Sequence, residues 1–115
     1  MNNILVSKDN IFNLEEEIHT FKSDNKIVLD ITNIKKEYKI TILENVKVEL
    51  ILTGKNANIS FKILLNKNSN LVIQSFIIDG NINIDANLLK ESNFTLNNSL
   101  LNNCDSNNNI KVTHL

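Results

Sequence analysis

The residues that could do chemistry in this chain are few. The single cysteine, Cys104, could act as a nucleophile only if His114 lay beside it in space as a base. Cys104 belongs to no CxxC pair and has no histidine close in sequence, so neither a zinc site nor a local redox pair is predicted. A small corner residue is the favoured interpretation of Cys104. His19 is interpreted as a surface residue near a helix, and His114 alone indicates nothing.

The acidic triplet Glu15–Glu17 is the remaining candidate for ion binding. Three consecutive acids point in different directions on a helix, so a solvated face is favoured over a cation site. The sequence contains no P-loop, no dinucleotide-binding fingerprint and no nucleophile elbow. We therefore predict a protein that is not an enzyme, with no catalytic residue and no metal ligand. Cys104 and His114 are kept only as candidate cofactor-binding residues.

Charge and composition exclude several classes of partner. The net charge is −1 and the lysines are scattered, so neither a basic stripe nor an aromatic platform indicates nucleic acid. The segment Met1–Val6 lacks the charged flank and apolar run of a signal peptide, and no run reaches membrane-spanning length. A single cysteine suits a reducing compartment, so a cytoplasmic location is expected.

The elements that would position these residues are set by a repeat of about 23 residues. Three blocks can be superposed: Ile34–Asn56, Ala57–Asp79 and Gly80–Asn102. Within each block, apolar residues alternate with polar ones, pause at a polar corner and then alternate again. A period of two places one strand face toward a core, and a repeat of this length marks a unit that stacks on copies of itself. The residues expected inside are Tyr38, Ile40, Phe61, Ile63, Leu65, Leu71, Ile84, Phe94 and Leu96.

The repeat predicts an all-β solenoid of parallel coils. Glycine turns at the block junctions leave an alternative open, because Asp79-Gly80 is also typical of a tight hairpin and hence of an antiparallel meander or sandwich. Stacking is favoured because matching residues recur in columns, which would include Val46/Ser69/Ser92 and Lys47/Asn70/Asn93. Stacked Asn side chains can hydrogen-bond along such a column. A solvated outer face is the alternative interpretation of these columns.

Residues 1–33 are expected to cap residues 34–115, which form the solenoid repeats. The cap would contain a short strand at Ile4–Val6 and a later strand through Ile27, Leu29 and Ile31. A helix over about residues 13–22 is predicted from Asn13 followed by Glu16, although a strand continuing from Ile11 also fits.

The last segment, Ile110–Leu115, alternates like a strand and ends without a polar cap. Natural proteins rarely leave such a strand edge bare, because it templates pairing with another chain. A homodimer, or a complex with a longer partner, is therefore expected at this end.

Three segments of the repeat, Ile42–Leu50, Leu65–Ile73 and Leu88–Leu96, resemble the core of the SufB/SufD family of iron–sulfur cluster assembly scaffolds. The final residues Asn109–Leu115 resemble the strand that leads into the family's histidine-containing segment. Together the similarity spans about residues 27–115. His114 matches only the first element of that segment, and Cys104 matches no motif of the family.

The resemblance implies a right-handed parallel β-helix with about two strands per coil. It also implies dimerisation, or pairing with a SufB/SufD-like partner, and association with a SufC-like ABC-type ATPase. Family members carry a longer β-helix and a C-terminal helical region that holds the ATPase. An iron–sulfur cluster would accordingly be held only within a complex, and none by the isolated chain.

Three functions follow as hypotheses. The first is a non-catalytic, SufD-like scaffold subunit or fragment in iron–sulfur cluster assembly. The second is a structural β-solenoid that self-associates without a cofactor. The third is a small β binding module, for which the low aromatic content of 5% makes a ligand pocket difficult to build.

Overall fold

The structure is a computed structural model that describes residues 12–98 and 109–115; the predicted strand at Ile4–Val6 and Cys104 lie outside this part of the chain. The described residues form nine strands and no helix. The strands are β1 (Ile18–Phe21), β2 (Asn25–Asp30), β3 (Lys35–Ile42), β4 (Lys47–Thr53), β5 (Asn58–Leu65), β6 (Asn70–Ser75), β7 (Asn81–Leu88), β8 (Asn93–Asn98) and β9 (Asn109–His114).

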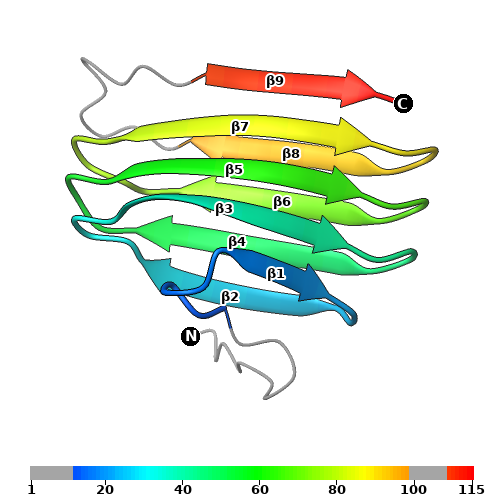
Figure 1. Ribbon diagram of the computed structural model, residues 1–115, viewed down its shortest axis with the longest axis horizontal. Coiled ribbons are helices and arrows are strands. Elements are labelled where there is room, and N and C mark those ends of the chain that lie inside the picture. The colour runs from blue at the N-terminus through cyan, green and yellow to red at the C-terminus, as the bar shows by residue number, and fades with distance from the viewer. Residues whose placement is uncertain (1–11, 99–108) are drawn as a thin grey trace.

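The strands build two parallel sheets that face each other. We call the sheet ordered β1-β3-β5-β7-β9 sheet A, and the sheet ordered β2-β4-β6-β8 sheet B. The chain alternates between the sheets, so two successive strands make one coil, and each coil rises right-handedly above the last (Figure 1). The strands of sheet A run opposite to those of sheet B. The predicted right-handed parallel solenoid is therefore confirmed.

Successive coils are stacked in a constant register. Lys35 pairs with Asn58 and Asn58 with Asn81, which is an offset of 23 residues each time (58 − 35 and 81 − 58). The same offset relates Lys47 to Asn70 in sheet B. The alternative of an antiparallel hairpin at Asp79-Gly80 is wrong, because this dipeptide is a corner that carries the chain from sheet B to sheet A.

The core fills the space between the sheets with inward-facing columns of apolar side chains. Of the residues predicted to be inside, seven are buried: Tyr38, Ile40, Phe61, Ile63, Leu65, Leu71 and Ile84. Phe94 and Leu96 also face inward but are only partly buried, because β8 is the last described strand of sheet B. Both glycines, Gly54 and Gly80, lie outside the strands, and the sequence contains no proline. The strand interiors are therefore free of residues that weaken or interrupt a sheet.

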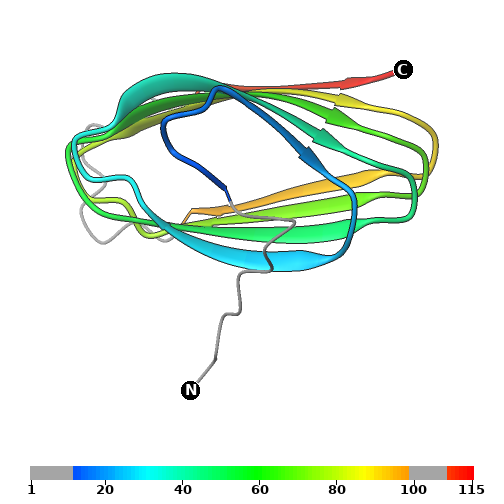
Figure 2. The same ribbon diagram turned by 60° about the horizontal axis from the view of Figure 1, so that its bottom comes forward.

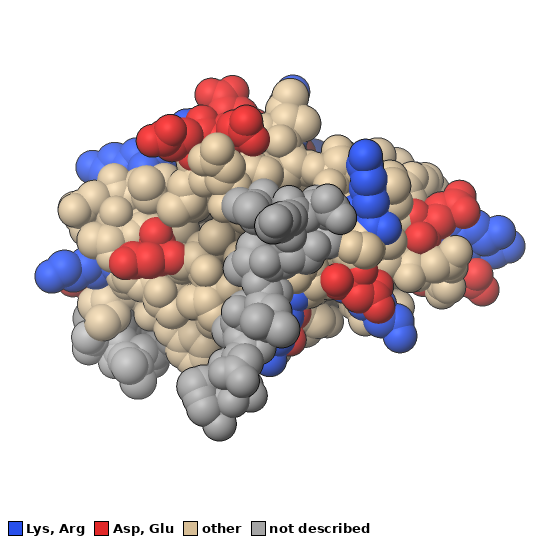
Figure 3. Space-filling model, turned by 90° about the horizontal axis from the view of Figure 1, so that it is seen from below, with Lys and Arg blue, Asp and Glu red and all other residues tan. Residues whose placement is uncertain are grey.

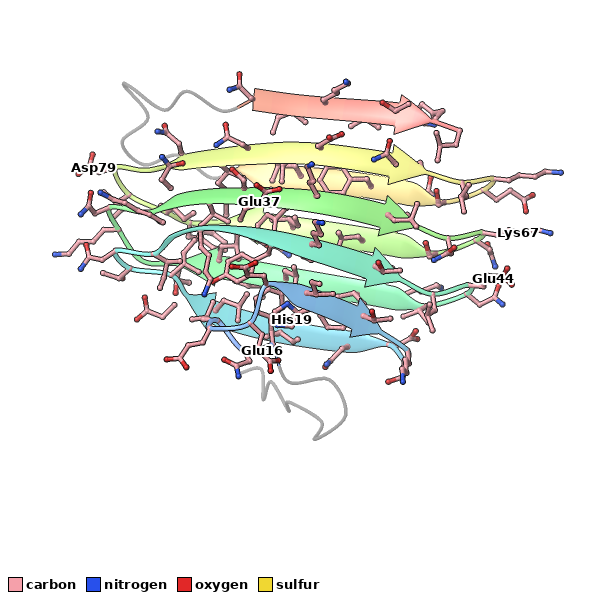
Figure 4. All side chains as sticks on the ribbon, viewed as in Figure 1. Glu16, His19, Glu37, Glu44, Lys67 and Asp79 are labelled. Atoms are coloured by element: carbon pink, nitrogen blue, oxygen red, sulfur yellow. The ribbon has the colours of Figure 1, made fainter. Side chains whose placement is uncertain are left out.

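The corners repeat as regularly as the strands. A residue with positive φ recurs every 23 positions at each end of the coils, as Asn33, Asn56 and Asp79 at one end and Asn45, Asn68 and Glu91 at the other. Asn tolerates the left-handed conformation better than most residues other than glycine, which explains why it occupies four of these six positions. Figure 4 shows Glu44 and Lys67 projecting from one end of the coils and Asp79 from the opposite end.

The two columns predicted from the sequence, Val46/Ser69/Ser92 and Lys47/Asn70/Asn93, differ in burial and in hydrogen bonding. Ser69 and Ser92, with Val46 below them, are buried, and each serine hydroxyl donates at 2.6 Å to the carbonyl three residues earlier. The interpretation of this column as a solvated outer face is therefore wrong. Lys47, Asn70 and Asn93 do form a column. Stacked Asn side chains hydrogen-bond in other columns, at the corners and along sheet A.

The predicted helix over residues 13–22 is wrong. Asn13 begins a turn, in which its side-chain oxygen accepts from the Glu15 amide at 2.9 Å, and β1 follows from Ile18. β1 pairs in parallel with β3, and β2 with β4, so these two strands form the first coil. The predicted strand through Ile27 and Leu29 is confirmed as β2.

Candidate functional site

The two histidines lie at opposite ends of the solenoid. His19 is in β1, in the first coil, and His114 is the last residue of β9, which lies beyond the fourth coil (Figure 1). The structure therefore does not bring them together. Cys104 lies outside the described residues, so its distance from His114 is not part of the described geometry. Within residues 12–98 and 109–115, no three His, Cys, Asp or Glu side chains are grouped in a way that could hold a metal ion.

The acidic triplet Glu15–Glu17 is exposed, as expected, although it lies in a turn and not on a helix. Glu17 lines a shallow depression of about 440 Å³ on the outer face of sheet A, together with Ile18, Glu37, Lys39 and Lys62. Lys62 and Glu37 are 3.9 Å apart, and both side chains are more than half exposed. An ion pair in water contributes little, and charges of both signs give this depression no selectivity for an ion.

A cluster of rings closes the N-terminal end of the core. Figure 2 shows the segment before β1 crossing the opening between the two sheets. Phe12 is buried there and stacks on the His19 ring, with centroids 3.8 Å apart and planes 10° apart. The rings of Phe12 and Tyr38 pack edge to face with centroids 5.2 Å apart, and the Tyr38 hydroxyl donates to the Leu14 carbonyl at 2.6 Å. We call Phe12, His19 and Tyr38 the N-terminal ring cluster.

His19 is therefore buried, and the expectation of a surface residue is wrong. Its Nε2 lies 3.1 Å from the Asn13 carbonyl oxygen, whereas its Nδ1 is buried and has no hydrogen-bond partner. Burial lowers the pKa of His19, opposed by the Asn13 carbonyl and by the charge of Glu16. His19 stacks on Phe12 and lies tilted against Tyr38, 6.0 Å between centroids, so we interpret it as a packing residue of this end. Figure 3 shows the same end from below, with acidic and basic residues interspersed around it.

The C-terminal end of the core is arranged differently. Ile110 continues the inward column of Tyr38, Phe61 and Ile84, but it is 43% exposed whereas Ile84 is 3% exposed. In the next column, Val112 is 41% exposed and lies above Ala86, which is fully buried. These side chains face the core and remain accessible because no described strand of sheet B lies opposite β9.

Two strand edges are also unpaired at this end among the described residues. β9 pairs only with β7, and β8 pairs only with β6. The inward residues Phe94 and Leu96 of β8 are only partly buried, as expected for the last strand of a sheet. We define the open end as the inward side chains Phe94, Leu96, Ile110, Val112 and His114, together with the free edges of β8 and β9.

His114 belongs to this surface. It stands above Leu88 in a column whose lower members are Ile42 and Leu65, so a polar ring occupies a position that is apolar in every coil below. The alternation of Ile110–Leu115 and the unpaired edge could both be predicted from the sequence. Among the described residues sheet A has five strands and sheet B has four, and the alternation of Ile110–Leu115 alone does not assign β9 to either sheet.

No protein-family model, curated protein or solved structure matches this chain. In the part of the chain that the structure describes, no helix has the length and apolar character needed to cross a membrane.

Proposed function

We propose that this chain is a non-catalytic, scaffold-type subunit that acts by binding another protein chain at its open end. The observation that carries the proposal is the exposure of Ile110 and Val112, whose equivalents in the coil below are buried. Apolar side chains that face a core lose contact with water when a further strand covers them, which supplies the main driving force for association.

The free edges of β8 and β9 would also fix the orientation of a bound partner strand. An edge strand presents a row of N–H and C=O groups that a strand from another chain can pair with. Main-chain hydrogen bonds would orient the partner strand, while the inward positions of β8 and β9 would select its apolar residues. Such a surface binds and positions a protein partner, and it needs no catalytic group.

The narrower form of the proposal places this subunit in cytoplasmic iron–sulfur cluster assembly, in a SufD-like role beside a SufC-like ATPase. Its support is the resemblance of the repeat sequence, together with the two-strand coils that this resemblance implies. In this form Cys104 and His114 would contribute to a cluster only within a complex, since clusters are typically held by several thiolates.

The test of the broader proposal compares two valines of equal exposure. Val112 lies at the open end and Val28 lies on the outer face of sheet B, and each is 41% exposed. Val112→Lys should weaken association of the chain, with itself or with a purified partner, by at least about tenfold. Val28→Lys should leave it unchanged. Light scattering and circular dichroism measure assembly and folding. Equal effects of the two variants on assembly would refute the proposal.

The narrower form is tested by anaerobic reconstitution with iron and sulfide, with and without a SufC-like ATPase and a SufB-like partner. We expect a stoichiometric cluster chromophore only in the complex. A stable chromophore in the isolated chain that is lost in Cys104→Ser would contradict the expectation that the chain alone holds no cluster. No binding to either partner would refute the SufD-like role.

A further inference from the structure

We propose that Asp79 is a site of spontaneous isomerisation, at which the main chain is rerouted through the Asp79 side chain to give isoaspartate. Asp79 and Gly80 form the corner that carries the chain from β6 to β7. The site is independent of the proposed function, because it lies at a corner of the coils and not in the strands of the open end. Both reacting groups belong to adjacent residues, so no cofactor or partner is needed.

The reaction joins a backbone nitrogen to the side chain of the preceding residue. The Gly80 nitrogen bonds to Cγ of the protonated Asp79 carboxyl group, and the amide hydrogen leaves with the carboxyl hydroxyl as water. The product is a cyclic succinimide. Water then opens the ring at either carbonyl carbon: attack at Cγ restores Asp79, whereas attack at the main-chain carbonyl leaves Gly80 attached through Cγ. The net change is an isomerisation, so no oxidant or reductant is consumed.

The fold itself requires a glycine after Asp79. A Cβ at position 80 would lie 2.6 Å from the Ala57 carbonyl oxygen and 2.9 Å from Cγ2 of Ile77, so a residue with a side chain does not fit at this corner. The lack of a side chain also leaves the Gly80 nitrogen unshielded and its backbone free to rotate toward the Asp79 carboxyl group. Attack by an adjacent group in the same chain benefits from a high effective concentration.

The Gly80 amide is also not held in the hydrogen bond that is usual at these corners. In four of the six corners with a positive-φ residue other than glycine, the next residue donates its amide to the carbonyl three residues earlier, at 3.0–3.2 Å; these donors are Ile34, Val46, Ser69 and Ser92. Among residues 12–98 and 109–115, the Gly80 amide has no such acceptor, and neither has the Ala57 amide. An amide without a hydrogen bond can react without first giving one up, and only at Gly80 does it also lack the shielding of a side chain.

The Asp79 carboxyl group is free as well. It is exposed and projects from the end of the coils (Figure 4), and within the described part of the chain it has no hydrogen-bond or ion-pair partner. The other described Asp residues are restrained. Asp24 and Asp30 each accept a hydrogen bond from a backbone amide, at 2.8 and 3.1 Å, and Asp85 lies within β7. Among the described Asp residues, only Asp79 combines a free carboxyl group with an unpaired amide and a following glycine.

Isoaspartate would disturb the stacking at this corner, because it adds one carbon atom to the main chain after Asp79. Two hydrogen bonds on either side of Asp79 hold the corner on the coil below. The Ile78 amide donates to the Gly54 carbonyl at 3.0 Å, and the Asn81 amide donates to the Ala57 carbonyl at 2.9 Å. A longer main chain does not fit both contacts without a shift of the corner, so the isomerised chain should be less stable.

Water enriched in heavy oxygen tests the site in the unaltered protein. Each passage through the succinimide incorporates one oxygen atom from water, at whichever carbonyl the ring opens. The folded chain is incubated near neutral pH, digested and analysed by mass spectrometry. We expect the peptide with Asp79 to carry at least about tenfold more label than the peptides with Asp24, Asp30 or Asp85. Asp79→Glu should abolish this label, because the longer side chain forms the corresponding larger ring far more slowly.

The aged protein should also contain isoaspartate at position 79 and unfold at a lower urea concentration than fresh protein. The Asp79→Glu variant should keep its unfolding midpoint on ageing. Labelling of Asp79 only after unfolding in urea would overturn the proposal, as would equal labelling of all four peptides. An aged protein that contains isoaspartate but unfolds at an unchanged urea concentration would refute the effect on stacking.

Discussion

The Asn56 side chain donates from Nδ2 to Oδ1 of Asn33, 2.8 Å away, and the two residues lie one coil apart at the same corner. Asn68 donates to Asn45 in the same way at 2.7 Å, at the opposite corner. All four residues have positive φ. One residue type thus satisfies two requirements, because Asn tolerates the left-handed backbone and its amide both donates and accepts along the stack.

Each of these two ladders of Asn side chains ends after two members. Asp79 and Glu91 occupy the next positions, where a carboxylate has no proton to donate to the Asn below. We predict that Glu91→Asn raises the free energy of unfolding by about 1 kcal/mol, through one added hydrogen bond and a better left-handed residue. Glu44→Asn makes the same chemical change at a corner residue without positive φ, and urea denaturation should show no gain. A gain of equal size in both variants would refute the ladder explanation.

Phe61 tests the stacked core. It is 1% exposed and lies between Tyr38 below and Ile84 above in one column. Phe61→Ala should lower the free energy of unfolding by roughly 3–5 kcal/mol, because the coils above and below hold the cavity open. Phe94→Ala is the matched control at a partly buried position of the last strand of sheet B, and its cost should be clearly smaller in dilute solution. Equal costs would contradict the observed burial.

The middle of the fold could be predicted from the sequence because parallel stacking with a constant offset aligns equivalent residues. Ile40 pairs with Ile63 and Ile63 with Ala86, and each belongs to a row of apolar residues at every second position of its strand. In the first coil only β1 departs from this spacing, because Ile18 pairs with Lys39 at an offset of 21 (39 − 18). β2 keeps the offset of 23, from Asn25 to Val48 (48 − 25), so it follows the repeat whereas β1 does not.

Local signals at the N-terminus also indicated the wrong element. Asn13 and Glu16 have the spacing of a helix cap, and Asn13 does accept an amide hydrogen bond, from Glu15. The same contact also stabilises an isolated turn, and here pairing of β1 with β3 outweighs it. The burial of His19 could not be predicted, because it depends on Phe12 folding back across the end of the core.

Gly54 is predicted to be irreplaceable at its corner. Its φ is 118°, and a Cβ at this position would lie 2.6 Å from the Thr32 hydroxyl oxygen and 2.7 Å from the Thr32 backbone nitrogen. Gly54→Ala should therefore cost roughly 1–3 kcal/mol from the backbone conformation alone. Lys55→Ala, at the exposed next residue, should cost much less in the same urea titration. Tolerance of alanine at position 54 would show that the corner can adopt another path.

The stability of the N-terminal ring cluster should depend on pH through His19. Because burial lowers the pKa of His19 in the folded chain, the unfolded chain binds the proton more readily once the pH falls below the ordinary value of about 6.5. The stability contributed by neutral His19 is therefore fully present above that pH. It is lost as the pH falls toward the folded pKa, by at most about 1.4 kcal/mol per pH unit.

The measurement is the free energy of unfolding from urea titrations at about pH 7.5 and about pH 5, where an ordinary histidine changes its charge. The wild type should lose more stability on acidification than His19→Gln, which cannot titrate. His114→Gln provides the control, because His114 is exposed at the other end of the solenoid and its replacement should leave the loss unchanged. Near-ultraviolet circular dichroism of Tyr38, the only tyrosine, reports on the cluster directly. If His19→Gln loses as much stability as the wild type, titration of His19 is not the cause.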